Sequence, residues 1–151
     1  MKEISAHRSG VTGNILLVDD NRHGLVARKT LLEEQGHRIT TATNGEEALE
    51  AFSKAPFDLI VTDFRMPKMS GLELIVKIRK THPEVPIILV SGLIEALGLD
   101  EKSTGADVVI QKDTHEISHL MRAASRLLSK RTAKKPPASQ RSPRSRAKGA
   151  Q

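Results

Sequence analysis

Residues 15–20 read Ile-Leu-Leu-Val-Asp-Asp, a short apolar run that stops at two acidic side chains. The run is too short for a buried helix and is apolar on both faces, which is typical of a strand in a parallel sheet covered on both sides. Four more short apolar runs follow along the chain, at residues 39–42, 59–61, 87–90 and 108–110. We therefore expect five strands.

The stretches between these runs have helical patterns. In the last of them, the apolar residues from Ile117 to Leu128 recur at helical spacing and form one stripe. Gly36 is expected to cap the first helical stretch in a left-handed conformation. The pattern is weakest over residues 93–103, because Gly98 interrupts it. Capping boxes are predicted for three pairs: Asn44 with Glu47, Ser70 with Glu73, and Asp113 with Glu116.

Five strands alternating with five helices through short links predict right-handed crossovers. The expected fold class is α/β, an open sandwich in which a five-stranded parallel sheet carries helices on both faces. Ligands of such sheets bind outside the carboxyl ends of the strands, near the point where the strand order reverses. The residues at those ends are therefore the first candidates for a functional site.

The 151-residue chain carries a net charge of +6, and its basic excess lies at one end. Eight Lys and Arg residues and no acidic residue follow residue 129, which leaves 16 basic against 18 acidic residues before it. This end lacks an apolar period, so it cannot offset its chain entropy by burial. We expect a disordered lead over residues 1–12, a globular domain over residues 13–129 and a disordered basic tail over residues 130–151.

Several classes of protein are excluded by composition. The chain has no Cys, which excludes a disulfide scaffold, a thiolate zinc site and a cysteine nucleophile. It has no Trp or Tyr and only three Phe, so a base-stacking platform for single-stranded nucleic acid is not expected. The sequence has no signal-peptide core, and no apolar run approaches the roughly 18 residues that a membrane span requires. We expect a cytoplasmic protein with no membrane span.

Polar residues stand at the carboxyl ends of four of the five predicted strands: Asp19, Asp20, Asp63, Ser91 and Lys112. Any one of them could be an ordinary helix cap or a solvent-facing side chain. Together they converge on one edge of the predicted sheet. Three neighbouring carboxylates repel one another, and a hard divalent cation with oxygen ligands, such as Mg²⁺, resolves that repulsion. The scattered histidines do not form a competing zinc site, and the pair at positions 115 and 119 is expected to face solvent.

The chain lacks a Walker loop, a nucleophile elbow and a dinucleotide-binding glycine fingerprint. The chemistry that remains for this group is phosphoryl transfer to a carboxylate. An Asp can attack phosphorus and form an acyl phosphate when cations and hydrogen-bond donors stabilise the transferring group. Mg²⁺, the ammonium of Lys112 and the hydroxyl of Ser91 would supply that stabilisation.

Four motifs identify the family that the chain resembles. They are Leu-Leu-Val-Asp-Asp-Asn at 16–21, Asp-Leu-Ile-Val-Thr-Asp-Phe-Arg-Met-Pro-Lys-Met-Ser-Gly at 58–71, Ser-Gly at 91–92, and a lysine at 112. Over residues 13–129 the chain resembles the receiver domains of two-component response regulators, of the stand-alone type. The resemblance implies a flavodoxin-like fold with five strand–helix units and strand order 2-1-3-4-5.

The resemblance also implies a role for each site residue. Asp63 would be the phosphoacceptor, and Mg²⁺ would be ligated by Asp20, Asp63 and the backbone carbonyl of Arg65, with Asp19 acting largely through water. Ser91 would be the hydroxyl that follows the phosphoryl group, and Lys112 the cation paired with it. The phosphoryl donor would be a sensor histidine kinase or a histidine phosphotransfer protein. Output would pass through an unknown downstream protein, and the chain would assist only its own phosphorylation and dephosphorylation, without being an enzyme.

Two positions depart from the family pattern. Val109 stands where family members usually have Tyr or Phe, so aromatic switching is not available in its usual form. Asp113 stands where they usually have Pro; a cis bond there would cost about 2.5–4 kcal/mol, so we expect a trans peptide and a changed position of Lys112.

Two alternative functions remain. One is a pseudo-receiver or scaffold that acts through its basic tail, which could make weak, salt-dependent contacts with nucleic acid or an acidic partner. The other is a Mg²⁺-dependent phosphatase with an aspartyl-phosphate intermediate. Phosphatases of the haloacid dehalogenase type need an acid/base Asp two residues after the nucleophile, and that position is Arg65.

Overall fold

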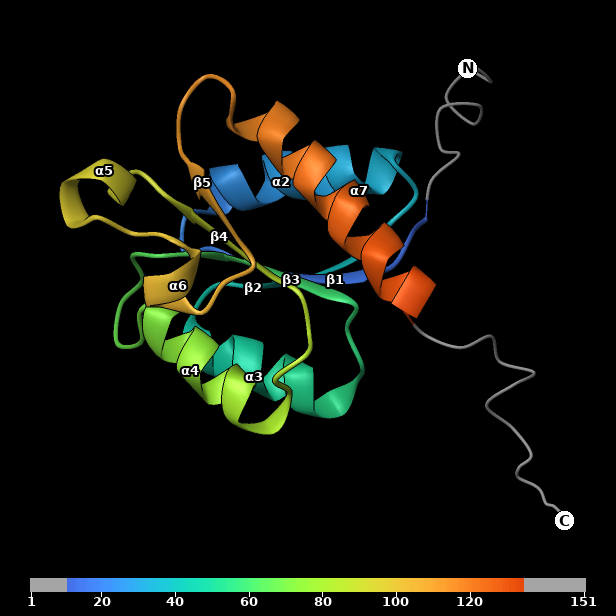
Figure 1. Ribbon diagram of the computed structural model, residues 1–151, viewed down its shortest axis with the longest axis horizontal. Coiled ribbons are helices and arrows are strands. Elements are labelled where there is room, and N and C mark those ends of the chain that lie inside the picture. The colour runs from blue at the N-terminus through green and yellow to red at the C-terminus, as the bar shows by residue number, and fades with distance from the viewer. Residues whose placement is uncertain (1–10, 135–151) are drawn as a thin grey trace, which may run out of the picture.

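The computed structural model describes residues 11–134, which form one α/β sandwich (Figure 1). The strands are β1 (Asn14–Val18), β2 (Arg38–Ala42), β3 (Leu59–Asp63), β4 (Ile87–Ser91) and β5 (Val108–Gln111). The helices are α2 (Arg22–Glu34), α3 (Gly45–Lys54), α4 (Gly71–Thr81), α5 (Ile94–Leu97), α6 (Glu101–Thr104) and α7 (Glu116–Lys134). All five predicted strands are present.

The sheet is wholly parallel, and its strand order is β2-β1-β3-β4-β5, as the resemblance implied. The order reverses between β1 and β3, so the carboxyl ends of these two central strands open the crevice where ligands bind in this fold. Both strands are almost wholly buried, which explains why their sequences are apolar on both faces.

Two hydrophobic clusters fill the two sides of the sheet, because successive strand residues point to opposite faces. One side, which includes Leu17 and Val61, packs against α2 and α7; the other, which includes Leu16 and Ile60, packs against α3 and α4. Figure 1 shows α2 and α7 together on one face, and α3 and α4 on the other. Helices thus cover both faces, as expected.

The weak pattern over residues 93–103 is resolved into two short helices. Gly98 adopts a left-handed conformation with φ of 63° and ends α5, and the carboxylate of Asp100 caps α6 by accepting from the backbone N–H of Ser103. Five helices alternating with five strands predicted a single helix in this stretch, and that prediction is wrong. A glycine C-cap and an Asp N-cap two positions apart divide the stretch into two short helices instead of one continuous helix.

The predicted capping residues have three different outcomes. Ser70 and Glu73 form the reciprocal box at the start of α4. Asn44 caps α3, but the carboxylate of Glu47 accepts from Thr43 instead of returning to Asn44. The third box is absent: the Asp113 carboxylate accepts from the N–H of His115, and Glu116 pairs elsewhere. Gly36 has the expected positive φ, at 100°.

The last helix is longer than predicted. We placed the end of the domain at residue 129, whereas α7 continues to Lys134. Its apolar stripe ends with the buried pair Leu127 and Leu128, and in the following turn Nε of Arg131 lies 3.8 Å from Oδ1 of Asp58. The predicted disorder of residues 1–10 and 135–151 lies outside the described residues. Among residues 11–134, no helix is long and apolar enough to cross a membrane.

Candidate functional site

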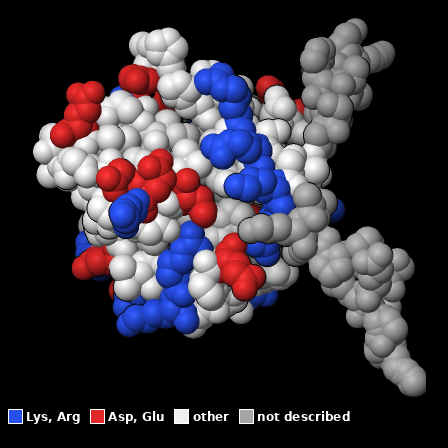
Figure 2. All heavy atoms as spheres, in the orientation of Figure 1, with Lys and Arg blue, Asp and Glu red and all other residues white. Residues whose placement is uncertain are grey.

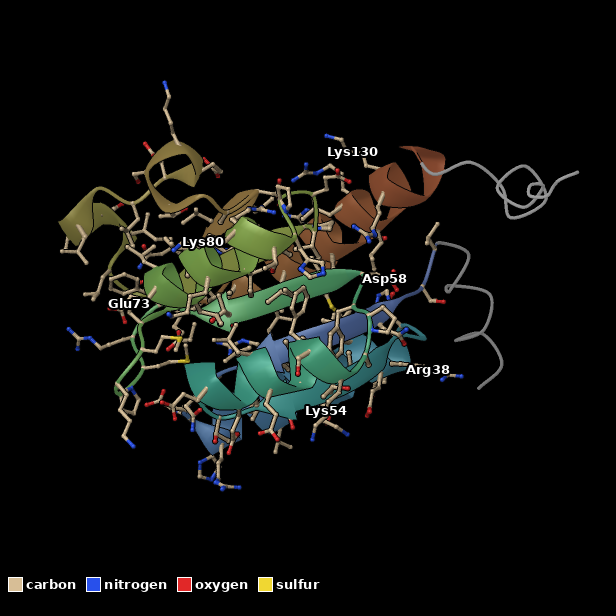
Figure 3. All side chains as sticks on the ribbon, turned by 90° about the horizontal axis from the view of Figure 1, so that it is seen from below. Arg38, Lys54, Asp58, Glu73, Lys80 and Lys130 are labelled. Atoms are coloured by element: carbon tan, nitrogen blue, oxygen red, sulfur yellow. The ribbon has the colours of Figure 1, made fainter. Side chains whose placement is uncertain are left out.

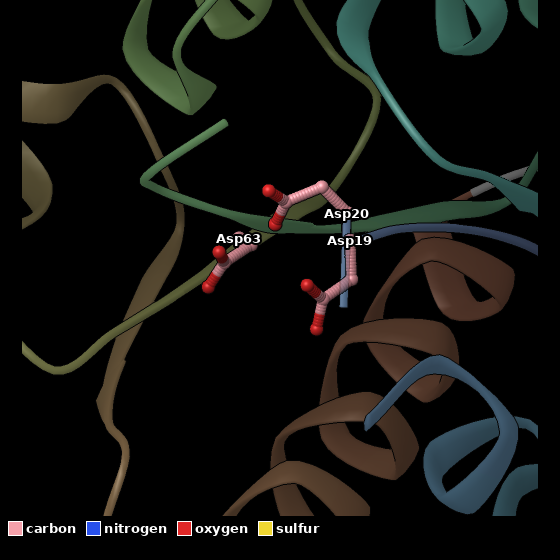
Figure 4. A group of neighbouring side chains, drawn as sticks. All are labelled: Asp19, Asp20 and Asp63. Atoms are coloured by element: carbon pink, nitrogen blue, oxygen red, sulfur yellow. The ribbon is translucent and has the colours of Figure 1, made fainter. Parts of the chain in front are cut away.

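The predicted acidic residues meet at the carboxyl edge of the sheet. Asp19 and Asp20 follow β1, and Asp63 is the last residue of β3, so the pairing of these two strands brings the three side chains together. One carboxylate oxygen from each residue lies within 4.8 Å of the other two (Figure 4). Asp19 and Asp63 are buried, whereas Asp20 is exposed. The close approach of the three carboxylates, predicted from the sequence, is confirmed.

A cleft of about 580 Å³ opens over these carboxylates and contains every predicted site residue. Its walls include Asp19, Asp20, Asp63, Arg65, Ser91 and Lys112. Arg65 is exposed beside the cleft, in the loop that follows β3. The predicted residues therefore line one space at the reversal of strand order.

Lys112 forms an ion pair with Asp63, one of the two buried carboxylates. Its ammonium nitrogen lies 2.6 Å from Oδ1 of Asp63, and the Asp63 side chain is only 5% exposed. Burial raises the pKa of the Asp63 carboxyl above its ordinary value, and the ion pair with Lys112 opposes that rise. Asp113 was expected to change the position of Lys112, but the lysine side chain still reaches Asp63.

Ser91 ends β4 beside Asp63, which ends β3. Its Oγ accepts a hydrogen bond from the backbone N–H of Leu93 at 2.9 Å, which orients the side chain, and its own hydroxyl proton remains available as a donor. The residue is buried in the wall of the cleft. A group bound above Asp63 would find an oriented hydroxyl on one side and an ammonium on the other.

The loop after β3 lines the cleft and is held tightly against the end of the strand. Gly71 begins α4, and its N–H donates to the carbonyl oxygen of Phe64 at 2.7 Å. A Cβ at this position would overlap the backbone carbonyl of Asp63, so only glycine allows α4 to start so close to the strand end. Lys68 in the same loop has a positive φ of 70°. This packing fixes the backbone that carries Asp63.

A buried arginine at the site was missed by the sequence analysis. Arg28 of α2 reaches Oδ2 of Asp19 through Nη1 at 2.5 Å and Oε2 of Glu116 through Nε at 2.6 Å. Its partners lie 9 and 88 positions away in the sequence, so no local spacing indicates either contact. The one sequence feature that could have indicated this ion pair is Gly24, one helical turn before Arg28. Because glycine has no side chain, it leaves space beside the pair.

The donor set fits a hard divalent cation. It offers three carboxylates without His or Cys, and Mg²⁺ is bound through carboxylates, carbonyls and water. Both oxygens of Asp19 already accept hydrogen bonds, from Arg28 and from the N–H of Asn21. Asp20 and Asp63 are therefore the carboxylates best placed for direct contact with a metal ion.

The fold and the site together define a doubly wound α/β domain with an acidic cleft at the reversal of strand order. A profile of the response regulator receiver domain matches residues 15–125. The chain belongs to this family.

Curated relatives match the chain over part of their own length. The gliding motility regulatory protein of Myxococcus xanthus is 33% identical over 119 residues, covering 75% of this chain and 15% of the relative. Response regulator RR06 of Streptococcus pneumoniae is 39% identical over 83 residues, covering 53% of this chain and 36% of the relative. The chain thus spans well under half of the length of these two proteins.

Solved receiver structures match over nearly their whole length. Response regulator TrrA from Thermotoga maritima, in complex with Mg²⁺-BeF, is 36% identical with a TM-score of 0.69, covering 76% of this chain and 97% of that structure. Chemotaxis response regulator CheY4 of Vibrio cholerae is 27% identical with a TM-score of 0.69, covering 78% and 99% respectively. Receiver domains of this family are signalling modules that bind Mg²⁺ at their acidic pocket.

Proposed function

We propose that this chain is a phosphoacceptor in a two-component phosphorelay, with Asp63 as the residue that is phosphorylated. The observation that carries the proposal is the convergence of Asp20, Asp63, Ser91 and Lys112 on one cleft at the reversal of strand order. The donor would be a phosphohistidine on a sensor histidine kinase or on a histidine phosphotransfer protein. Phosphorylation would switch the affinity of the chain for a downstream partner.

Transfer forms a bond between an oxygen of Asp63 and phosphorus, while the bond between phosphorus and the donor histidine nitrogen breaks. The electron pair of the broken bond stays on the imidazole, which takes up a proton, and Asp63 becomes an acyl phosphate. Bound Mg²⁺, which Asp20, Asp63, the carbonyl of Arg65 and water next to Asp19 would hold, supplies positive charge to the phosphoryl oxygens. Asp63 acts as the nucleophile because its carboxylate ends β3 at the floor of the cleft.

Lys112 and Ser91 would stabilise the group as it is transferred. Lys112 already lies beside Asp63, and its ammonium can remain paired with a phosphoryl oxygen after the carboxylate charge is lost. The Ser91 hydroxyl can donate to another phosphoryl oxygen, since its Oγ accepts from Leu93 and keeps its proton free. In this proposal the chain assists its own phosphorylation and does not turn over a separate substrate.

The basic tail is proposed to make a weak contact with nucleic acid or an acidic partner. Figure 2 shows Lys and Arg side chains gathered along α7, where Arg122, Arg126 and Lys130 are exposed at a spacing of four residues. The sequence continues into further basic residues, so this ridge and the tail have the same sign of charge. We also propose that the protein is cytoplasmic.

Intact-mass measurement after incubation with Mg²⁺ and acetyl phosphate tests the phosphoacceptor role. We expect the chain to gain one phosphoryl group and Asp63→Asn to gain none. The matched control is Asp58→Asn, which makes the same change just before the opposite end of β3 (Figure 3). Equal labelling of the chain and Asp63→Asn would overturn the assignment, and sustained hydrolysis of small phosphate esters would favour the phosphatase.

A further inference from the structure

Arg28 is the one arginine that is buried among the residues whose side chains are described, and it lies beside the cleft without lining it. Its guanidinium bridges two carboxylates, that of Asp19 in the acidic cluster and that of Glu116 at the first residue of α7. Arg28 is 6% exposed and Asp19 is 1% exposed, so water does little to weaken this contact. The proposed phosphoryl-transfer mechanism assigns no role to this arginine.

The local sequence is arranged to admit the guanidinium. Gly24 precedes Arg28 by one helical turn, and a Cβ there would lie 3.2 Å from Oδ2 of Asp19 and 3.6 Å from Nη1 of Arg28. A larger side chain would press on the ion pair. The other oxygen of Asp19 accepts from the backbone N–H of Asn21, so the carboxylate is held from both sides. Asp19 is thereby fixed in orientation before any metal ion binds.

The bridge also determines the charge of the cleft. Asp19, Asp20 and Asp63 carry three negative charges, and Lys112 and Arg28 offset two of them. Without Arg28 the same group would hold a net charge of two negatives, which attracts a divalent cation more strongly. Glu116 acts in the opposite direction, because it shares the guanidinium and so weakens the effect of Arg28 on Asp19.

We propose that Arg28 is a positioning residue: it is the internal counter-ion of Asp19, holds that carboxylate in place and sets the Mg²⁺ affinity of the cleft. Glu116 of α7 competes with Asp19 for the same guanidinium. The inference rests on the proposed function, since it concerns the same acidic group. Arg28 does not touch the phosphoryl group. It acts through Asp19, by keeping one oxygen of that carboxylate occupied and by lowering the negative charge available to the metal.

Isothermal titration calorimetry of the full chain with MgCl₂, at fixed ionic strength, measures the Mg²⁺ affinity and so tests this role directly. We expect Arg28→Met to bind Mg²⁺ about tenfold more tightly, because a positive charge next to the cluster is removed. We expect Glu116→Gln to bind about threefold more weakly, because Arg28 then acts on Asp19 alone. The opposite signs are the decisive result. A purely structural brace between α2 and α7 would lose the same contact in both variants and shift both affinities in the same direction.

Two further variants complete the test. Arg28→Lys keeps the positive charge, and we expect an affinity within about threefold of the native chain. Arg38→Met removes an equal charge from the amino-terminal end of β2, at the far end of the sheet (Figure 3), and should leave Mg²⁺ affinity unchanged. If Arg28→Met does not fold, because Asp19 is left buried without its partner, Glu116→Gln still tests the expected loss of Mg²⁺ affinity, and a large change of affinity in Arg28→Lys would contradict the role of the charge.

The outcomes separate this inference from the proposed function. If the native chain binds Mg²⁺ and is labelled by acetyl phosphate, but Arg28→Met and Glu116→Gln shift the affinity in one direction or not at all, the role of Arg28 is wrong and the phosphoacceptor role stands. If the native chain neither binds Mg²⁺ nor is labelled, the proposed function fails and the inference fails with it.

Discussion

The ammonium nitrogen of Lys112 lies 2.6 Å from Oδ1 of Asp63, although the two residues belong to the ends of strands that are separated by β4. The contact can form across the end of β4 because parallel strands bring their carboxyl ends to one edge of the sheet. It holds a cation at the floor of the cleft, where a transferred phosphoryl group would gain negative charge.

Lys112→Met should slow phosphorylation by acetyl phosphate about a hundredfold, because one preorganised source of positive charge is lost from the transition state. The rate of gain of the phosphoryl group, followed by intact mass at saturating Mg²⁺, measures the effect. Lys77→Met, an exposed position on α4 away from the cleft, is the matched control and should keep the native rate. A native rate in Lys112→Met would show that the ion pair has no part in transfer.

Gly71→Ala should destabilise the fold by about 2 kcal/mol, because its Cβ would overlap the carbonyl of Asp63 and only a shift of backbone can relieve the overlap. The same shift displaces the phosphoacceptor, so labelling should fall as well. Urea unfolding measures the first effect and acetyl phosphate labelling the second.

The matched control for that substitution is Gly92→Ala. Gly92 is exposed beside Ser91, and a Cβ there would meet nothing within 4 Å. We expect its free energy of unfolding to stay close to the native value. Equal stability of the two alanine variants would contradict the close approach of α4 to the end of β3.

Arg79→Met should lower the free energy of unfolding by about 2 kcal/mol, since it removes several hydrogen bonds from a charged donor. The guanidinium donates to the carbonyls of Pro83 and Val85 before β4, to that of Gly105 after α6, and to the Asp107 carboxylate. It thereby joins the end of α4 to two connecting segments. Lys80→Met, at the exposed neighbouring position, should cost little in the same urea titration. Similar losses in both variants would show that the network contributes no net stability.

The features predicted correctly from the sequence were those encoded by neighbouring residues. The buried strands were visible as apolar runs, and the site was visible because a parallel sheet brings its strand ends to one edge. The contacts of Arg28 with Glu116, and of Arg79 with Gly105 and Asp107, were not visible, because these partners are distant in sequence and charged residues on helices usually face solvent. Glu116 shows the conflict directly: its spacing from Asp113 indicated a capping box, but the buried guanidinium of Arg28 provides a stronger partner than an exposed backbone N–H.

The stability of the fold should also depend on the protonation of His37. Burial lowers the pKa of this histidine below its usual 6.5, and its Nδ1 accepts a hydrogen bond from the backbone N–H of Gly13 at 3.2 Å, which requires that nitrogen to be unprotonated. The unfolded chain therefore binds a proton at a higher pH than the folded chain does. The contribution of His37 is fully present above a pH of about 6.5 and is lost as the pH falls through the lower pKa of the folded state.

His37→Gln should flatten this part of the pH profile, because glutamine does not titrate and its side-chain oxygen can still accept from Gly13. Urea unfolding of both proteins between about pH 7.5 and pH 5 measures the difference, and the free energy of unfolding of the native chain should fall more steeply toward the acid end. Exposed His23 provides the matched control, since His23→Gln should leave the native slope unchanged. Parallel profiles for the native chain and His37→Gln would show that protonation of His37 is not linked to unfolding.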